Sequence, residues 1–246
     1  MQTAVSVEKV NFRYANNAEL ALSNIDLKIS AGDRFGLFGP NGAGKTTLIS
    51  VMTGLLKPLS GSVQLFGMDA AADRNAKKIF GYVPQDFAFY DELTPVENLE
   101  FFGAWSGLNR SRIKKRTDEL LTVLGLNEVR NKVLKTFSGG MKRRLNIAIG
   151  VIHEPKILFL DEPTVGVDVQ TRFAIIDYLK QMNTQGATLI YTSHLLQEAQ
   201  DLCKHIALID DGKIILNDDL EKLLIEHDKE GLEELFLNLT GKAYRD

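Results

Sequence analysis

The chain has 246 residues, a formal net charge of −3 and one cysteine, Cys203. This length suits one large α/β domain, or a domain with an inserted lobe, and the slightly acidic balance argues against a nucleic-acid partner. One cysteine excludes an internal disulfide framework, and the apolar helical pattern around Cys203 places it in the core. The N-terminal residues do not resemble a signal peptide and no long apolar run predicts a membrane span, so we expect a cytosolic protein.

Alternating apolar residues near the N-terminus predict half-buried antiparallel strands. They occupy residues 5–14 and 25–29, and a similar pattern returns at residues 62–66. Tyr14 continues the alternation of Phe12, so one interpretation places its ring in the core. These segments predict an N-terminal antiparallel subdomain.

The segment 39–46, GPNGAGKT, fits the pattern G-x-x-x-x-G-K-S/T of a loop that wraps the phosphates of a nucleotide. Its glycines permit the positive φ angles with which successive amide groups point at one anion. Lys45 adds positive charge for the β- and γ-phosphates, and Thr46 supplies a hydroxyl for Mg²⁺. Residues 34–38 predict a buried strand before the loop, and residues 47–52 predict a helix whose dipole favours the phosphates. We expect Lys45 to be solvated and to carry no core packing.

Between about residues 87 and 150 the sequence becomes helical, which predicts an inserted lobe. A capping box with proline at the first helical position begins at Thr94, and residues 113–124 keep helical spacing up to Gly125. Three aromatic residues, at positions 87, 89 and 90, stand where the lobe begins. They fit either a packed core or an exposed docking surface.

Ser138, Gly139 and Gly140 open a further helix of this lobe. Ser138 suits an N-cap, and the glycines allow an anion to approach closely. An ordinary capped helix would explain the pattern by itself. Because the phosphate loop already supplies one anion site, a second one would serve another nucleotide or another subunit.

Residues 156–160 and 187–191 are nearly continuous apolar runs, as expected for parallel strands covered on both faces. Asp161 and Glu162 follow the first run, at the carboxyl end where such sheets bind ligands. Asp161 is suited to hold Mg²⁺, directly or through water, and Glu162 to accept a proton from the water that attacks the γ-phosphate. Further along, residues 207–216 predict a hairpin, and an amphipathic helix is expected in the tail.

The order of the motifs resembles the ATP-binding subunit of ABC transporters over essentially the whole chain. That order is the phosphate loop, Gln85, the segment 138–140, Asp161 and Glu162, Asp168 and His194. Residues 136–142, TFSGGMK, match the family signature except that Met141 stands where glutamine is common. Together with residues 163–168, PTVGVD, and residues 231–237, GLEELFL, this looks like the ABC-2-type export subfamily.

The resemblance implies further roles. Tyr14 would stack on adenine, Gln85 would sense Mg²⁺ and the γ-phosphate, Asp168 would link the two sites of a dimer, and His194 would contact the γ-phosphate. The catalytic set is then Glu162, His194 and Gln85, and the metal set is Thr46, Gln85 and Asp161. The residues implied to bind the nucleotide are Tyr14, Gly39, Pro40, Asn41, Gly42, Ala43, Gly44, Lys45, Thr46, Thr47, Ser138, Gly139 and Gly140.

We therefore predict an α/β P-loop NTPase in a single domain, residues 1–246. It has a mixed core sheet, an N-terminal antiparallel β-subdomain, an inserted helical subdomain at about 87–150 and a helical tail at about 218–246. The resemblance implies an ATPase that uses ATP and Mg²⁺. It also implies that two copies form a homodimer and drive an exporter permease on a separate chain, at the inner face of the plasma membrane.

Two other interpretations stay open. The ATPase could serve a soluble assembly machine instead of a permease. A small-molecule P-loop kinase would need a lid that binds the phosphate acceptor and would have no use for the segment 138–140. Cargo and permease identity do not follow from the sequence, because the cargo touches the permease.

Overall fold

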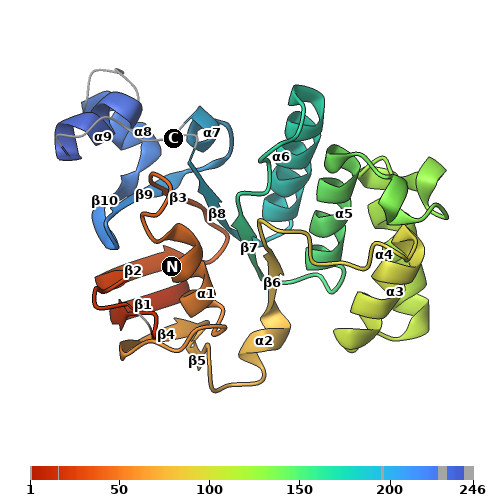
Figure 1. The fold of residues 1–246 in the computed structure, drawn as a ribbon, viewed down its shortest axis with the longest axis horizontal. Coiled ribbons are helices and arrows are strands. Elements are labelled where there is room, and N and C mark those ends of the chain that lie inside the picture. The colour runs from red at the N-terminus through yellow and green to blue at the C-terminus, as the bar shows by residue number, and fades with distance from the viewer. Residues whose placement is uncertain (1, 16, 195–196, 227–231, 241–246) are drawn as a thin grey trace.

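The computed structural model describes residues 2–15, 17–194, 197–226 and 232–240, and among these the strands form two sheets (Figure 1). The antiparallel sheet has the order β2-β1-β4-β5 and consists of β1 (Thr3–Phe12), β2 (Leu22–Ser30), β4 (Ser60–Leu65) and β5 (Met68–Asp69). The core sheet has the order β10-β9-β3-β8-β7-β6 and consists of β3 (Arg34–Phe38), β6 (Phe80–Val83), β7 (Ile157–Asp161), β8 (Thr188–Ser193), β9 (His205–Asp210) and β10 (Lys213–Asp219). The α-helices are α1 (Lys45–Met52), α2 (Ala76–Ile79), α3 (Pro95–Trp105), α4 (Arg110–Val123), α5 (Gly139–Val151), α6 (Val169–Thr184), α7 (Gln197–Leu202), α8 (Leu220–Glu226) and α9 (Leu232–Thr240).

The core sheet is mixed, as predicted. Strands β9, β3, β8, β7 and β6 run parallel, and β10 pairs with β9 in the antiparallel direction. The hairpin turns through Asp211 and Gly212, whose φ angles of 45° and 71° are both left-handed. This backbone suits the twist of a two-residue hairpin, so the Asp-Gly turn signal is confirmed.

Each face of the core sheet is buried against a different layer. Ile157 and Phe159 of β7 join a cluster that includes residues of the antiparallel sheet and α1. Leu158 and Leu160, which point the other way, join a second cluster that includes α5 and α6. Because both faces are covered, every residue of β7 and β8 is buried, which explains why the two strands read as continuous apolar runs.

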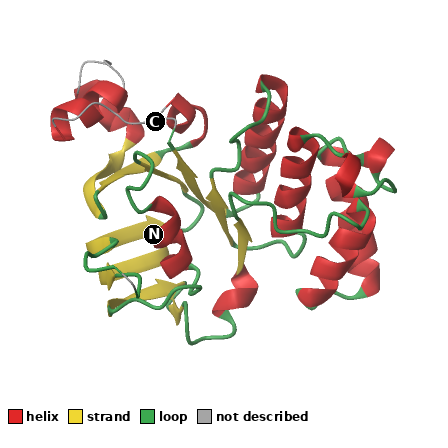
Figure 2. Cartoon of the chain, in the orientation of Figure 1, coloured by secondary structure: helices red, strands yellow, loops and turns green. Residues whose placement is uncertain are grey.

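The helical lobe lies beside the core sheet, on the side away from the antiparallel sheet, with α5 between the sheet and the α3–α4 pair (Figures 1 and 2). The predicted capping box is present, because Thr94 and Glu97 each accept a hydrogen bond from the other's backbone. Helix α4 ends just before Gly125, whose φ angle is 64°. The lobe predicted at about 87–150 thus contains α3, α4, α5 and two short 3₁₀ turns, Asn127–Val129 and Leu134–Thr136.

Some predicted boundaries were wrong. Strand β1 ends at Phe12, so Tyr14 lies outside the strand, and β4 ends at Leu65 because Phe66 turns into a left-handed conformation. Strand β10 runs to Asp219, and the first helix after it, α8, begins at Leu220, close to the predicted start of the helical tail at about 218. Helix α9 confirms the amphipathic tail; Gly231 of the tail motif lies outside the described residues. None of the helices in the described ranges combines the length and apolarity needed to cross a membrane.

We expect Gly81→Ala to destabilise the fold by about 3 kcal/mol, because a Cβ at this position of β6 would overlap the backbone oxygen of Gly150 in α5. Gly32→Ala is the matched control. Its Cβ would meet no atom within 4 Å, so only its left-handed φ of 75° is strained, at a cost of about 1 kcal/mol. Urea unfolding measures both changes, and equal losses would contradict the close helix–strand contact.

Candidate functional site

The carboxyl ends of the parallel strands bring the predicted site residues together. The register pairs Phe38 with Ser193, Asp161 with Thr192, and Val83 with Leu160. The phosphate loop after β3, Gln85 after β6, Glu162 after β7 and His194 after β8 therefore emerge at one edge of the sheet. This is the edge at which open α/β sheets bind ligands.

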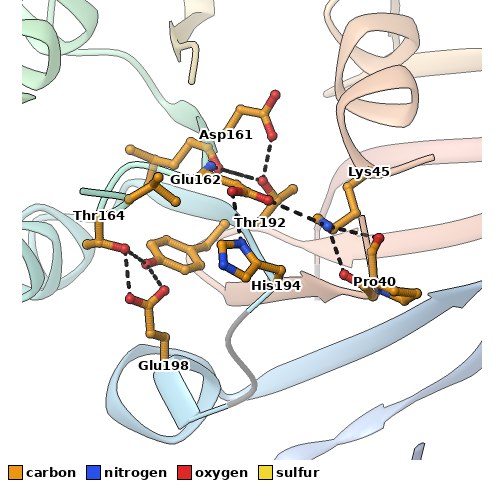
Figure 3. Close-up of polar contacts among 12 residues, drawn as sticks. Pro40, Lys45, Asp161, Glu162, Thr164, Thr192, His194 and Glu198 are labelled. Atoms are coloured by element: carbon orange, nitrogen blue, oxygen red, sulfur yellow. Dashed lines mark hydrogen bonds and ion pairs between the residues drawn. The ribbon is translucent and has the colours of Figure 1, made fainter. Parts of the chain in front are cut away.

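Lys45 is the first residue of α1 and is buried, with only 5% of its surface exposed. Its ammonium donates hydrogen bonds to the backbone oxygens of Gly39 at 2.7 Å and Pro40 at 3.2 Å. It also lies 3.5 Å from Oε1 of Glu162 (Figure 3). The prediction of a solvated lysine was wrong. Burial lowers the pKa of Lys45, and the charge of Glu162 opposes that shift.

Asp161 ends β7 and is fully buried. Its Oδ1 accepts a hydrogen bond of 2.7 Å from the Thr192 hydroxyl, whereas its Oδ2 has no hydrogen-bond partner among the described residues (Figure 3). Burial raises the pKa of Asp161, and the hydroxyls of Thr192 and Thr46 oppose this shift. A buried carboxylate oxygen without a partner, close to a threonine hydroxyl, fits the oxygen donors that Mg²⁺ requires.

Glu162 adopts a left-handed backbone, with a φ angle of 47°, and is 5% exposed. Thr192 holds this strained conformation, because the amide of Glu162 donates to the Thr192 hydroxyl at 3.1 Å and to its backbone oxygen at 3.2 Å. The carboxylate bridges two groups: Oε1 faces Lys45, and Oε2 lies 3.0 Å from Nδ1 of His194 (Figure 3). The side chain is thereby oriented by both neighbours.

A cavity of about 510 Å³ lies beside this cluster. Its lining includes Tyr14, residues of the phosphate loop, Gln85 and Glu162. Tyr14 is 42% exposed, its hydroxyl lies 3.0 Å from Thr47 Oγ1, and its ring meets Phe12 edge to face. The interpretation of Tyr14 as a core residue was therefore wrong, and its ring is accessible from the cavity.

The segment 138–140 does not line this cavity. Ser138 is exposed and caps α5, since its hydroxyl accepts a hydrogen bond of 3.3 Å from the Met141 amide. Asp168 caps α6 in the same way, through Thr171, which holds the pKa of its carboxyl below the usual range. Within one chain, both residues thus act as helix caps, apart from the Lys45 cluster.

Comparison with known proteins identifies the family. Residues 22–165, more than half of the chain, match the family described as "ABC transporter". The chain belongs to the ABC transporter family of ATP-binding proteins. Membership of this family confirms the predicted family, the ATPase class and the cofactors ATP and Mg²⁺.

Two curated relatives illustrate the similarity. The chain is 43% identical over 206 residues to the linearmycin resistance ATP-binding protein LnrL of Bacillus subtilis (strain 168), covering 83% of this chain and 66% of the relative. It is 38% identical over 210 residues to the Nod factor export ATP-binding protein I of Cupriavidus metallidurans, covering 83% and 68%. The chain thus spans about two thirds of the length of these relatives.

Solved structures agree with the fold. An ATP-binding subunit of an ABC transporter has a TM-score of 0.88 at 26% identity, covering 97% of this chain and all of that one. A dimeric ATP-binding cassette in a post-hydrolysis state, bound to ADP and Pi, has a TM-score of 0.80 at 27% identity, covering 88% and 98%. The predicted α/β architecture with an antiparallel subdomain and a mixed core sheet is confirmed.

The sequence analysis missed Thr192 and Arg143. Thr192 touches Asp161 and holds Glu162, and Arg143 is buried behind Gln85. The sequence held one signal for Thr192: its side chain carries a hydroxyl near the polar end of an otherwise apolar strand. Arg143 carried no such signal, because it stands between Lys142 and Arg144 in a run of basic residues, a pattern typical of a solvated helix face.

We expect Asp161→Asn to raise the unfolding temperature of the nucleotide-free protein by a few degrees near neutral pH. The raised pKa of Asp161 means that burial penalises its ionised form, so its ionisation destabilises the fold above the pKa. Asparagine keeps an oxygen for Thr192 and removes the charge. The gain should shrink as the pH falls toward the ordinary aspartate pKa, and melting curves at several pH values measure it. A gain that did not depend on pH would contradict this account.

Proposed function

We propose that this chain is the ATP-hydrolysing subunit of an exporter, coupling nucleotide-driven dimer closure to a separate transmembrane permease. The observation that carries the proposal is the cluster of buried Lys45 and Glu162 with half-buried His194, beside a cavity that Tyr14 and Gln85 line together with Lys45 and Glu162. The names of the relatives, which refer to linearmycin resistance and Nod factor export, support an exporter rather than a soluble assembly machine.

In this proposal the phosphate loop and Lys45 bind the phosphates, and Tyr14 stacks on the base. Thr46, Gln85 and Asp161 would hold Mg²⁺, which supplies charge neutralisation to the transferred phosphoryl group. Glu162 accepts the proton of the attacking water, since its Oε2 is free of the Lys45 contact. His194, 3.0 Å from that oxygen, orients the carboxylate and reaches toward the γ-phosphate.

Two copies would complete each site. Because Ser138 and Gly139 are exposed and lie outside the cavity of their own chain, they are available to the nucleotide of a partner. A head-to-tail homodimer places each helix start opposite the other chain's phosphate loop, and two-fold symmetry makes both sites equivalent. Asp168 would lie between them. The dimeric neighbour bound to ADP and Pi supports this arrangement.

The permease would dock on an exposed aromatic surface formed by Phe87, Tyr90, Phe101 and Trp105. These side chains are 41%, 46%, 42% and 82% exposed, and Tyr90 and Trp105 both contact the ring of Phe101. Aromatic side chains are enriched at protein interfaces, and exposed apolar patches mark them. Docking there would hold the chain at the inner face of the plasma membrane.

We expect Glu162→Gln to retain ATP binding and to slow hydrolysis by roughly 10²–10⁴-fold, the usual contribution of a general base. Glutamine keeps the shape and can still present an oxygen to Lys45 and an amide to His194, while it removes the proton acceptor. Steady-state ATPase assays measure the rate, and size exclusion with ATP should show more dimer than the wild type. Turnover near the wild-type rate would assign Glu162 a structural role.

A mixed dimer tests the shared site. We expect Ser138→Arg and Lys45→Ala to be inactive alone, because each homodimer has two damaged sites. Each site takes Lys45 from one chain and Ser138 from the other. In a dimer of one chain of each kind, both substitutions therefore fall in the same site and the other site is intact. This mixed dimer should recover part of the wild-type ATPase activity. Differential tags on the two chains isolate this mixed dimer for the assay. Full activity of pure Ser138→Arg would refute the shared site of the head-to-tail homodimer.

The substitutions Lys45→Ala and Ser138→Arg both need structural controls. Lys45→Ala leaves the oxygens of Gly39 and Pro40 without their donor, so its unfolding temperature must be measured with its nucleotide affinity. Asn109→Arg is the matched control for Ser138→Arg. It removes a similar N-cap, from α4, and should leave ATPase activity near the wild-type value.

A further inference from the structure

Arg143 is buried in the second turn of α5 and is 5% exposed. None of the ion pairs between described residues includes it. Its guanidinium instead donates to three backbone oxygens, those of Gln85 at 2.7 Å, Pro84 at 3.5 Å and Val165 at 3.5 Å. Burial lowers its pKa, and the charges of Asp86 and Glu162 oppose this shift. A buried guanidinium directed at main-chain oxygens fixes the position of backbone rather than of another charge.

The loop that follows β6 is held by a second side chain of the same helix. Asn146 is 2% exposed, donates to the Pro84 oxygen at 3.1 Å and accepts from the Ala88 amide at 3.3 Å. The ring of Phe87 completes the contact, since its centroid lies 4.9 Å from the Arg143 guanidinium carbon. The segment 84–88 is therefore clamped against α5 at both ends.

This clamp joins three parts of the proposed machinery. The clamped segment carries Gln85, which lines the cavity, and Phe87, which belongs to the aromatic surface. Val165 lies in the loop between Glu162 and Asp168. The helix that supplies Arg143 begins at Ser138, the cap proposed to face the partner's nucleotide.

Lysine would not replace this arginine. The guanidinium is a planar fork with five N–H donors, so it can serve separate oxygens at fixed angles, whereas an ammonium is a single point donor on a flexible stem. The oxygens of Gln85 and Val165 come from different loops, and one fork sets their mutual position. A substitution that keeps only the charge should therefore release part of the clamp.

We propose that Arg143 is a positioning residue that fixes the backbone of Gln85 relative to the Glu162–Asp168 loop, so that movement of α5 at Ser138 reaches the chain's own Gln85. The role of Gln85 in this statement rests on the proposed function. The clamp does not, because it is defined by contacts within the chain.

Hydrogen–deuterium exchange of the nucleotide-free protein tests the clamp directly. We expect Arg143→Met to speed exchange of the amides in residues 85–89 by about tenfold, and Arg143→Lys to give a smaller increase. Arg144→Lys is the matched control. The neighbouring Arg144 also donates to main-chain oxygens, those of Leu124, Gly125 and Gly140, and none of these acceptors lies in the segment 84–88. Unchanged exchange in folded Arg143→Met, or equal acceleration in Arg144→Lys, would overturn the proposal.

Steady-state kinetics test the action through Gln85. Arg143→Met should lower kcat with little change in KM for ATP, and it should add little to the defect of Gln85→Ala when the two are combined. Independent, multiplying defects would overturn the action through Gln85. If Gln85→Ala alone left ATPase activity unchanged while Arg143→Met still sped exchange in residues 85–89, the proposed role of Gln85 would fail and the clamp would stand.

Discussion

The site depends on the register of the parallel strands β3, β8, β7 and β6. Their carboxyl ends stop within two residue pairs of one another, so short loops suffice to gather side chains from distant parts of the sequence. Thr192 makes this register chemically specific, because one residue fixes Asp161 through its hydroxyl and Glu162 through both its hydroxyl and its backbone oxygen. A one-residue slip of β8 would reverse its faces and remove both contacts.

The same arrangement determines the electrostatics of the site. Lys45 and Glu162 are each 5% exposed, and burial of one charge alone would be costly. Their mutual contact offsets part of that cost, and Gly39, Pro40 and His194 satisfy the remaining polar groups. Phosphate oxygens would therefore replace existing partners of Lys45, because its ammonium group already has hydrogen-bond and ion-pair partners. Such an exchange makes phosphate binding sensitive to the orientation of Glu162.

The sequence predicted whatever is encoded locally. The phosphate loop, the strand before it, the capping box at Thr94 and the Asp-Gly hairpin each depend on neighbouring residues, and the structure contains all of them. The burial of Lys45, the exposure of Tyr14 and the contacts of Arg143 depend on segments that are far apart in sequence. Arg143 sits among Lys142 and Arg144 in the sequence, and only its packing against the segment 84–88 distinguishes it.

Helix α5 combines a feature encoded by neighbouring residues, its N-cap, with contacts to segments far apart in the sequence. Its first residues follow an exposed cap, its second turn holds the loop of Gln85, and its later residues pack against β6, where Gly81 and Gly150 permit close approach. A helix seated this tightly has little freedom to bend, so a displacement at Ser138 is transmitted along it instead of being absorbed. The exposed cap at Ser138 and the buried clamp at Arg143 and Asn146 thereby lie on consecutive turns of one rigid helix. The aromatic surface lies beside the clamped loop, so the same displacement would also move Phe87.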